Sequence, residues 1–249
     1  MLFRLSCIPF FSVGLALPVW LNAQIEVASP ISYGMSAEGL GRATDRLQQH
    51  IDDGDIAGVN AAVVRDGVFV YFESLGLMDI EQNKPMQKDT LFRIYSMTRQ
   101  ITTVAALILY QEGKFEFDDP IQMYLPDFEN QSVLIESQST NINQTKPRVN
   151  DITVQHLITH TSGLGSRSSP LYRENRVRDK NFTLDQMVSN AARIPLFKDP
   201  GTEFRYGIHA TILGKLIEVW SGRPLREFLE EELLSKLNMN STMFWTVVD

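Results

Sequence analysis

The stretch LFRIYSMTRQITTVAALILYQEGKFEFDDPIQMYLPDF, residues 91–128, places a serine just before a long apolar run. The run is unbroken from Val104 to Leu109 and is followed by Gly113, so we predict a buried helix over residues 96–112 that ends at this glycine. Ser96 stands at its start, where serine commonly caps a helix. The pattern alone therefore leaves two interpretations of Ser96 open, a helix cap and a nucleophile.

Arg99 lies three residues after Ser96, on the same face of the predicted helix. A lysine at this position is a known partner of a catalytic serine, since its amine reaches the hydroxyl across one turn and burial lowers its pKa. The positive end of the helix would also favour a developing oxyanion. A guanidinium, with a pKa above ~12, cannot act as a base near pH 7. Arg99 therefore predicts that any hydrolysis at Ser96 is impaired.

The rest of the chain predicts one hairpin and several helices. Ser36 can cap an amphipathic helix that ends near Gly54. Asp66-Gly67 separates two β-rich runs and is a strong hairpin signal. Residues 129–150 and 165–180 have the polar or arginine-rich composition of loops. Further helices are expected after Thr153, over Leu184–Ala192, around Ile212–Trp220 with an end at Gly222, and from Leu225 to about Leu237.

Two more blocks accompany the first stretch: ITVQHLITHTSGL, residues 152–164, and PGTEFRYGIHATILGKLIEVWSGRPLREFL, residues 200–229. Together, and in this order, the three blocks resemble the serine β-lactamase-related family, which includes class C β-lactamases, D-alanyl-D-alanine carboxypeptidases and bacterial carboxylesterases. The resemblance runs from about residue 36 to the end of the chain. It implies an α/β fold of the β-lactamase/transpeptidase type, with an N-terminal helix and hairpin plus a helical subdomain.

The resemblance also implies a catalytic site formed by Ser96, Arg99 and Tyr206. Ser96 would be the nucleophile, and Tyr206 would take its proton and pass it to the leaving group; by itself, a tyrosine near an apolar helix is more often a core residue. Tyr206-Gly207-Ile208 lacks the asparagine of the family's Tyr-x-Asn element, which favours esterase-like or peptidase-like hydrolysis over β-lactam resistance. The expected substrate is a small ester, an amide or a cell-wall peptide that acylates the serine, without a metal or an organic cofactor.

A third element of the family, Lys-Thr-Gly or His-x-Gly on a sheet strand, is not found in the 249 residues. We therefore expect an incomplete domain over residues 24–249, with its C-terminal sheet strands missing and its activity doubtful. Arg99 could still favour the phenolate of Tyr206, which would then be the base. The alternative is a catalytically silent fragment, or a remnant that binds peptidoglycan-like ligands.

The bulk properties limit partners and location. A formal net charge of −7 argues against general nucleic-acid binding, which needs a basic surface. Residues 1–23 have the basic start, apolar stretch and small Ala23 of a signal peptide, which predicts a periplasmic or secreted protein without stable membrane insertion. His156 and His160, four residues apart, could hold a metal on a helix face, although a structural role is favoured because no glutamate lies between them in the zinc-site pattern.

Overall fold

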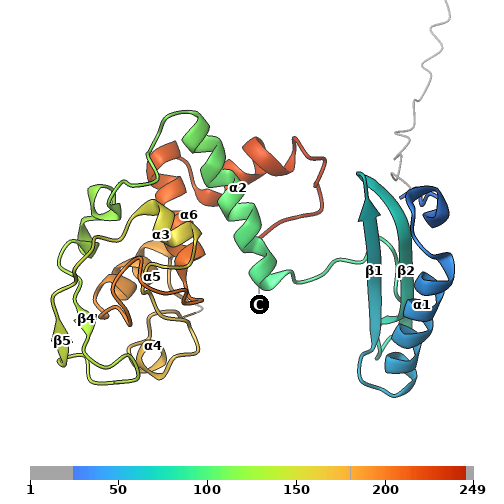
Figure 1. The fold of residues 1–249 in the computed structure, drawn as a ribbon, viewed down its shortest axis with the longest axis horizontal. Helices are drawn as coiled ribbons and strands as arrows, with labels where there is room; N and C mark the ends of the chain where they lie inside the picture. Colours follow the sequence, from blue (N-terminus) through green and yellow to red (C-terminus); the bar gives the residue numbers. More distant parts are fainter. Residues whose placement is uncertain (1–24, 180, 245–249) are drawn as a thin grey trace, which may run out of the picture. The chain divides into compact units, whose positions relative to one another are not determined.

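A computed structural model describes residues 25–179 and 181–244 (Figure 1). The predicted signal peptide, residues 1–23, lies outside the described residues. The chain divides into two compact units, residues 1–92 and 93–249. Within the described ranges, no helix combines the length and the apolar character that crossing a bilayer requires.

The first unit contains one long helix and a hairpin, as the sequence patterns predict, and a short third strand that completes an antiparallel sheet and was not predicted. Its helix begins after Ser36, whose Oγ accepts a hydrogen bond from the Gly39 N–H at 3.0 Å. Asp66 and Gly67 both have positive φ, 50° and 78°, as a tight two-residue hairpin turn requires. The elements are a 3₁₀ turn at Pro30–Tyr33, α1 at Ala37–Asp52, β1 at Gly58–Arg65, β2 at Val68–Asp79 and β3 at Lys84–Pro85, in the sheet order β1-β2-β3.

The second unit is mainly helical and carries two very short antiparallel strands (Figure 1). Two of its described helices begin at a threonine cap; the Thr183 side chain, for example, accepts a hydrogen bond from the Gln186 N–H. The helices are α2 at Thr98–Gln111, α3 at Val154–Ile158, α4 at Pro170–Glu174, α5 at Leu184–Ala192, α6 at His209–Ser221 and α7 at Leu225–Leu229, and the strands are β4 at Val133–Leu134 and β5 at Thr145–Lys146.

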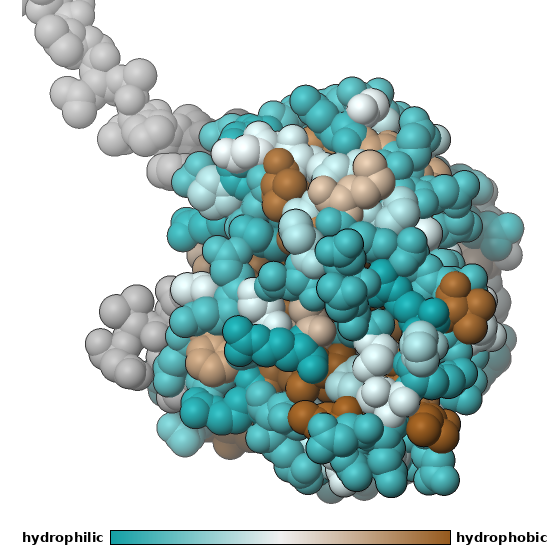
Figure 2. All heavy atoms as spheres, turned by 90° about the vertical axis from the view of Figure 1, so that its left-hand side faces the viewer, coloured by the Kyte–Doolittle hydropathy of each residue, from teal (hydrophilic) through white to brown (hydrophobic). Residues whose placement is uncertain are grey.

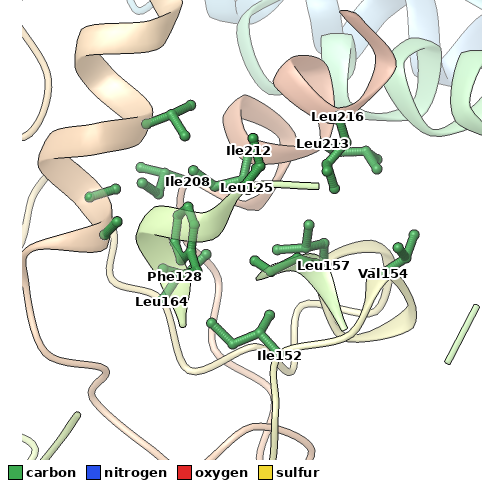
Figure 3. Close-up of a cluster of buried hydrophobic side chains, with 14 of the residues drawn as sticks. Leu125, Phe128, Ile152, Val154, Leu157, Leu164, Ile208, Ile212, Leu213 and Leu216 are labelled. Carbon is green, nitrogen blue, oxygen red and sulfur yellow. The ribbon is translucent and has the colours of Figure 1, made fainter. Parts of the chain in front are cut away.

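The core of the second unit forms around α6 and α3 (Figure 3). Ile212 and Leu216 of α6 lie near Leu157 of α3, and each is at most 2% exposed. Nearby, the ring of Trp220 stacks on Phe115 with centroids 4.1 Å apart. The face of the molecule in Figure 2 is mostly hydrophilic, with its hydrophobic residues in small groups. The sequence pattern of α6 predicts one apolar face. Its burial in this core is expected to stabilise the unit more than any other feature that the pattern predicts.

The prediction that the helix over residues 96–112 is buried all round is wrong. Thr102, Ala105 and Leu109 are at most 3% exposed, whereas Val104 and Leu107 are 44% and 37% exposed. An unbroken apolar run covers every side of a helix, but α2 packs through one side on α6. Periodicity could not reveal that side here, because the run carries no polar contrast.

Two segments differ from their predictions. Residues 165–180 are not a loose loop, because α4 lies within them and Leu171 and Tyr172 are buried. The predicted helix from Leu225 to about Leu237 is instead α7 followed by a π-helical turn at Glu230–Leu234. The wider turn shifts the helical register and allows the adjacent Leu233 and Leu234 both to be buried.

Candidate active site

Ser96 lies in a 3₁₀ turn, Tyr95–Met97, that leads directly into α2. Its side chain is not a cap, because the residue that precedes α2 is Met97 and neither the turn nor the helix has a side-chain cap hydrogen bond. Tyr95 has a φ of 41°, an uncommon conformation for a bulky residue, and such strain gathers at functional turns. The helix-cap interpretation of Ser96 is therefore wrong, and its hydroxyl is exposed at the start of a 14-residue helix.

The structure brings the three predicted site residues together. Arg99 donates a hydrogen bond from Nε to the Tyr206 hydroxyl at 2.7 Å, and its guanidinium carbon lies 4.2 Å from the centre of the tyrosine ring. The Ser96 side chain interacts with the same hydroxyl and lowers its pKa. Tyr206 is 47% exposed, so it is not the core residue that its apolar neighbours suggested as an alternative. One phenolic oxygen thus links a serine hydroxyl to a permanent cation.

These contacts change the acidity of the phenol. The interaction with the Ser96 side chain makes the largest contribution to lowering the pKa of Tyr206, and the hydrogen bond and charge of Arg99 lower it further. Partial burial acts in the opposite direction, while the charge of Arg167 adds a smaller favourable contribution. Tyr206 therefore loses its proton more easily than an isolated tyrosine does. Solvent at the exposed ring weakens each of these effects.

Tyr206 is held by a loop that pairs with residues 160–165. The Arg205 N–H donates to the His160 carbonyl at 2.8 Å, and the Ile208 N–H donates to the Gly165 carbonyl at 3.0 Å. A Cβ on Gly207 would lie 2.4 Å from that same Gly165 carbonyl oxygen. Only a glycine allows the two backbones to approach this closely, and their contact fixes where the phenol points.

Two histidines, His160 and His209, pack against this loop. The His160 ring stacks on Tyr206 with centroids 5.3 Å apart and meets the His209 ring edge-on at 4.7 Å. His209 is fully buried, and burial lowers its pKa to about 4. Its Nε2 lies 2.7 Å from the Arg205 carbonyl, which can only accept, so this nitrogen carries the proton and Nδ1 accepts from the Ser162 hydroxyl at 2.7 Å.

The sequence identified this histidine pair only in part. His209 begins α6, and the sequence did not predict its burial. The block at residues 152–164, with His160 and Ser162 in it, was the available signal. His156 has separate contacts, since its Nδ1 accepts a hydrogen bond from the Thr153 N–H at 3.2 Å. Among the described residues, no group of three or more metal-ligating side chains lies together.

The site opens into a cavity of about 600 Å³ within the second unit. Ser96, Arg99 and Tyr206 all line it, next to apolar residues such as Met187 and Leu225. Two further arginines, at positions 167 and 178, also line it, and sequence reasoning did not connect them with the site. A volume of this size suits a small organic molecule.

Comparison with known families identifies the family of the chain. The model of the family described as Beta-lactamase matches residues 43–248. The chain belongs to the beta-lactamase family. Its fold is accordingly the β-lactamase/transpeptidase-like fold that the three sequence blocks implied.

Several members of the beta-lactamase family are similar to this chain. Esterase EstB of Burkholderia gladioli is 29% identical over 229 residues, which cover 86% of this chain and 54% of EstB. The acyltransferase mokF of Monascus pilosus is 33% identical over 162 residues, 64% of this chain and 39% of mokF. A solved structure, EstCE1, a hydrolase with promiscuous acyltransferase activity, has 29% identity and a TM-score of 0.70 and covers 80% of this chain and 51% of its own. The chain spans about half the length of the relatives it matches most fully.

Proposed function

We propose that this protein transfers acyl groups from small esters or amides through an acyl-serine intermediate at Ser96. The hydroxyl of Tyr206 carries the proposal, because it accepts a hydrogen bond from Arg99 Nε at 2.7 Å, interacts with the Ser96 side chain, and can receive the serine proton. The esterase and acyltransferases among the relatives support this reaction class. The absence of the asparagine after Tyr206 continues to favour esters and amides over β-lactams.

The proposed reaction begins with Tyr206 in its phenolate form, stabilised by the Arg99 cation. As the Ser96 oxygen forms a bond to the substrate carbonyl carbon, its proton passes to the phenolate, and the carbonyl becomes an oxyanion near the positive start of α2. The tetrahedral intermediate then collapses: the bond to the leaving group breaks, and Tyr206 returns the proton to it. Water, or a second hydroxyl compound, removes the acyl group from the serine in the same way.

We expect this reaction to be slow. Arginine stays protonated, so Arg99 promotes the phenolate form but accepts no proton itself. Tyr206 is also 47% exposed, and water competes there with the hydrogen bonds that lower its pKa. The expectation of impaired activity therefore stays part of the proposal, with the proton acceptor placed on the phenol.

A fluorophosphonate probe tests the proposal. We expect slow labelling of the chain, located at Ser96 by peptide mass spectrometry, absent in Ser96→Ala and at least about 10-fold slower in Tyr206→Phe, since a general base contributes about 100-fold or more. Ser235→Ala is the matched control, because this exposed serine does not line the cavity. Equal labelling of the wild type and Ser96→Ala would contradict the proposal and favour the silent-fragment alternative.

A further inference from the structure

The cavity beside Ser96 carries more positive charge than the acyl-transfer chemistry uses, because that chemistry involves Arg99 alone. Arg99, Arg167 and Arg178 all line it, and its described lining contains no aspartate or glutamate. This arrangement is opposite in sign to the chain as a whole, whose formal net charge is −7. Three like charges around one small cavity need a reason, because they repel one another.

Local ion pairs do not neutralise this cluster. The structure gives Arg167 and Arg178 no hydrogen bond or ion pair with another described residue. Four other arginines of the unit, at positions 148, 176, 223 and 226, do have carboxylate partners. Asp179 follows Arg178 directly, but its carboxylate accepts a hydrogen bond from the Arg176 guanidinium at 2.6 Å. Arg167 and Arg178 are both exposed residues that line the cavity, so a ligand can reach them.

The electrostatics of the cluster support a role for an anion. Partial burial lowers the pKa of Arg178, and the charges of Arg167 and Arg99 lower it further. The charge of Arg167 also lowers the pKa of the Tyr206 phenol. A bound anion would relieve these repulsions, and guanidinium groups are well suited to carboxylates because they donate two parallel hydrogen bonds.

We propose that the site selects an ester or amide that carries a second, ionised carboxylate, which Arg167 and Arg178 hold while the scissile carbonyl faces Ser96. The proposal names the substrate class of the site above and so rests on the proposed function. The simple alternative is that both arginines only form a solvated basic rim. That alternative predicts no preference between a charged ligand and its neutral counterpart.

Binding to the full-length Ser96→Ala chain tests the proposal without requiring catalysis. The probes are glutaric acid monoanilide, an amide with a free carboxylate, and its methyl ester, which is neutral and nearly the same shape. We expect calorimetry or ligand-observed NMR to show at least about 10-fold tighter binding of the acid, consistent with one charge-assisted contact. The preference should decrease as salt concentration rises.

Three variants in the same Ser96→Ala background test whether the preference depends on Arg167 and Arg178 or on the overall positive charge of the unit. Arg167→Gln and Arg178→Gln should each reduce the preference for the acid about 3-fold or more, as expected for removal of one exposed charge contact. Arg193→Gln, which removes an exposed arginine of the same unit outside the cavity lining, should leave the preference unchanged.

Equal affinity for the two probes, no binding of either, or a preference that survives in the Arg167→Gln/Arg178→Gln double variant would overturn the proposal. Failure of fluorophosphonate labelling would instead count against Ser96 as a nucleophile and would not change the binding result. The two proposals can therefore fail separately.

Discussion

Protonation of His209 should destabilise the second unit in mild acid. Its imidazole is fully buried, and burial lowers its pKa from 6.5 to about 4. Between pH 6.5 and pH 4 this histidine is therefore protonated in the unfolded chain but largely neutral in the native state. The free energy of unfolding consequently falls as the pH drops through this range. These two pKa values correspond to a loss of about 2 kcal/mol between pH 7 and pH 5 from this histidine alone.

Urea denaturation of wild type and His209→Gln at pH 7 and pH 5 measures this loss, with tryptophan fluorescence as the probe because Trp220 belongs to the same unit. At pH 7 the variant should be about 1–3 kcal/mol less stable, because it disrupts hydrogen bonds to Ser162 and the Arg205 carbonyl. At pH 5 the difference should shrink by about 2 kcal/mol, because glutamine does not titrate. His156 and His160 also have lowered pKa values, but both proteins retain them. An unchanged difference between the two pH values would refute the reasoning.

Two further predictions concern the site and the loop that supports it. Arg99→Lys should increase the hydrolysis of p-nitrophenyl esters by about 10-fold or more, since a lysine can become a neutral base when partly buried; no increase would show that the arginine is not the limiting defect. Gly165→Ala should destabilise the second unit by about 1–3 kcal/mol in the same urea assay, because the added Cβ would lie 2.4 Å from Cε2 of Phe197. Gly41→Ala, in open space on α1, is its control and should not destabilise the chain.

Local signals in the sequence predicted much of the fold. The hairpin turn at Asp66-Gly67 and the helix over Leu184–Ala192 occur where expected, because turn and capping chemistry act within a few residues. The covered side of α2 and the π-helical turn after α7 could not be predicted in this way. Both depend on which neighbours pack against a helix, and that is a property of the tertiary fold.

The candidate site likewise has a part that sequence motifs predicted and a part that depends on the tertiary fold. Ser96 and Tyr206 were found through their blocks, and the structure adds that Arg99 lies on the phenol rather than only near the serine. Arg167 and Arg178 lie in the stretch with an arginine-rich composition, but no motif connected them with the site. Their relation to Ser96, some 70 to 80 positions earlier in the chain, exists only after folding.

The contact between Gly165 and Gly207 has a consequence for anyone who wishes to redesign the cavity. Since main-chain atoms set the spacing of the two loops there, Gly207 offers no side chain to exchange. Changes of ligand preference are better sought at other lining residues, such as Met187 and Ser168. Diversity introduced there would alter recognition while the geometry around the reactive oxygen stays constant.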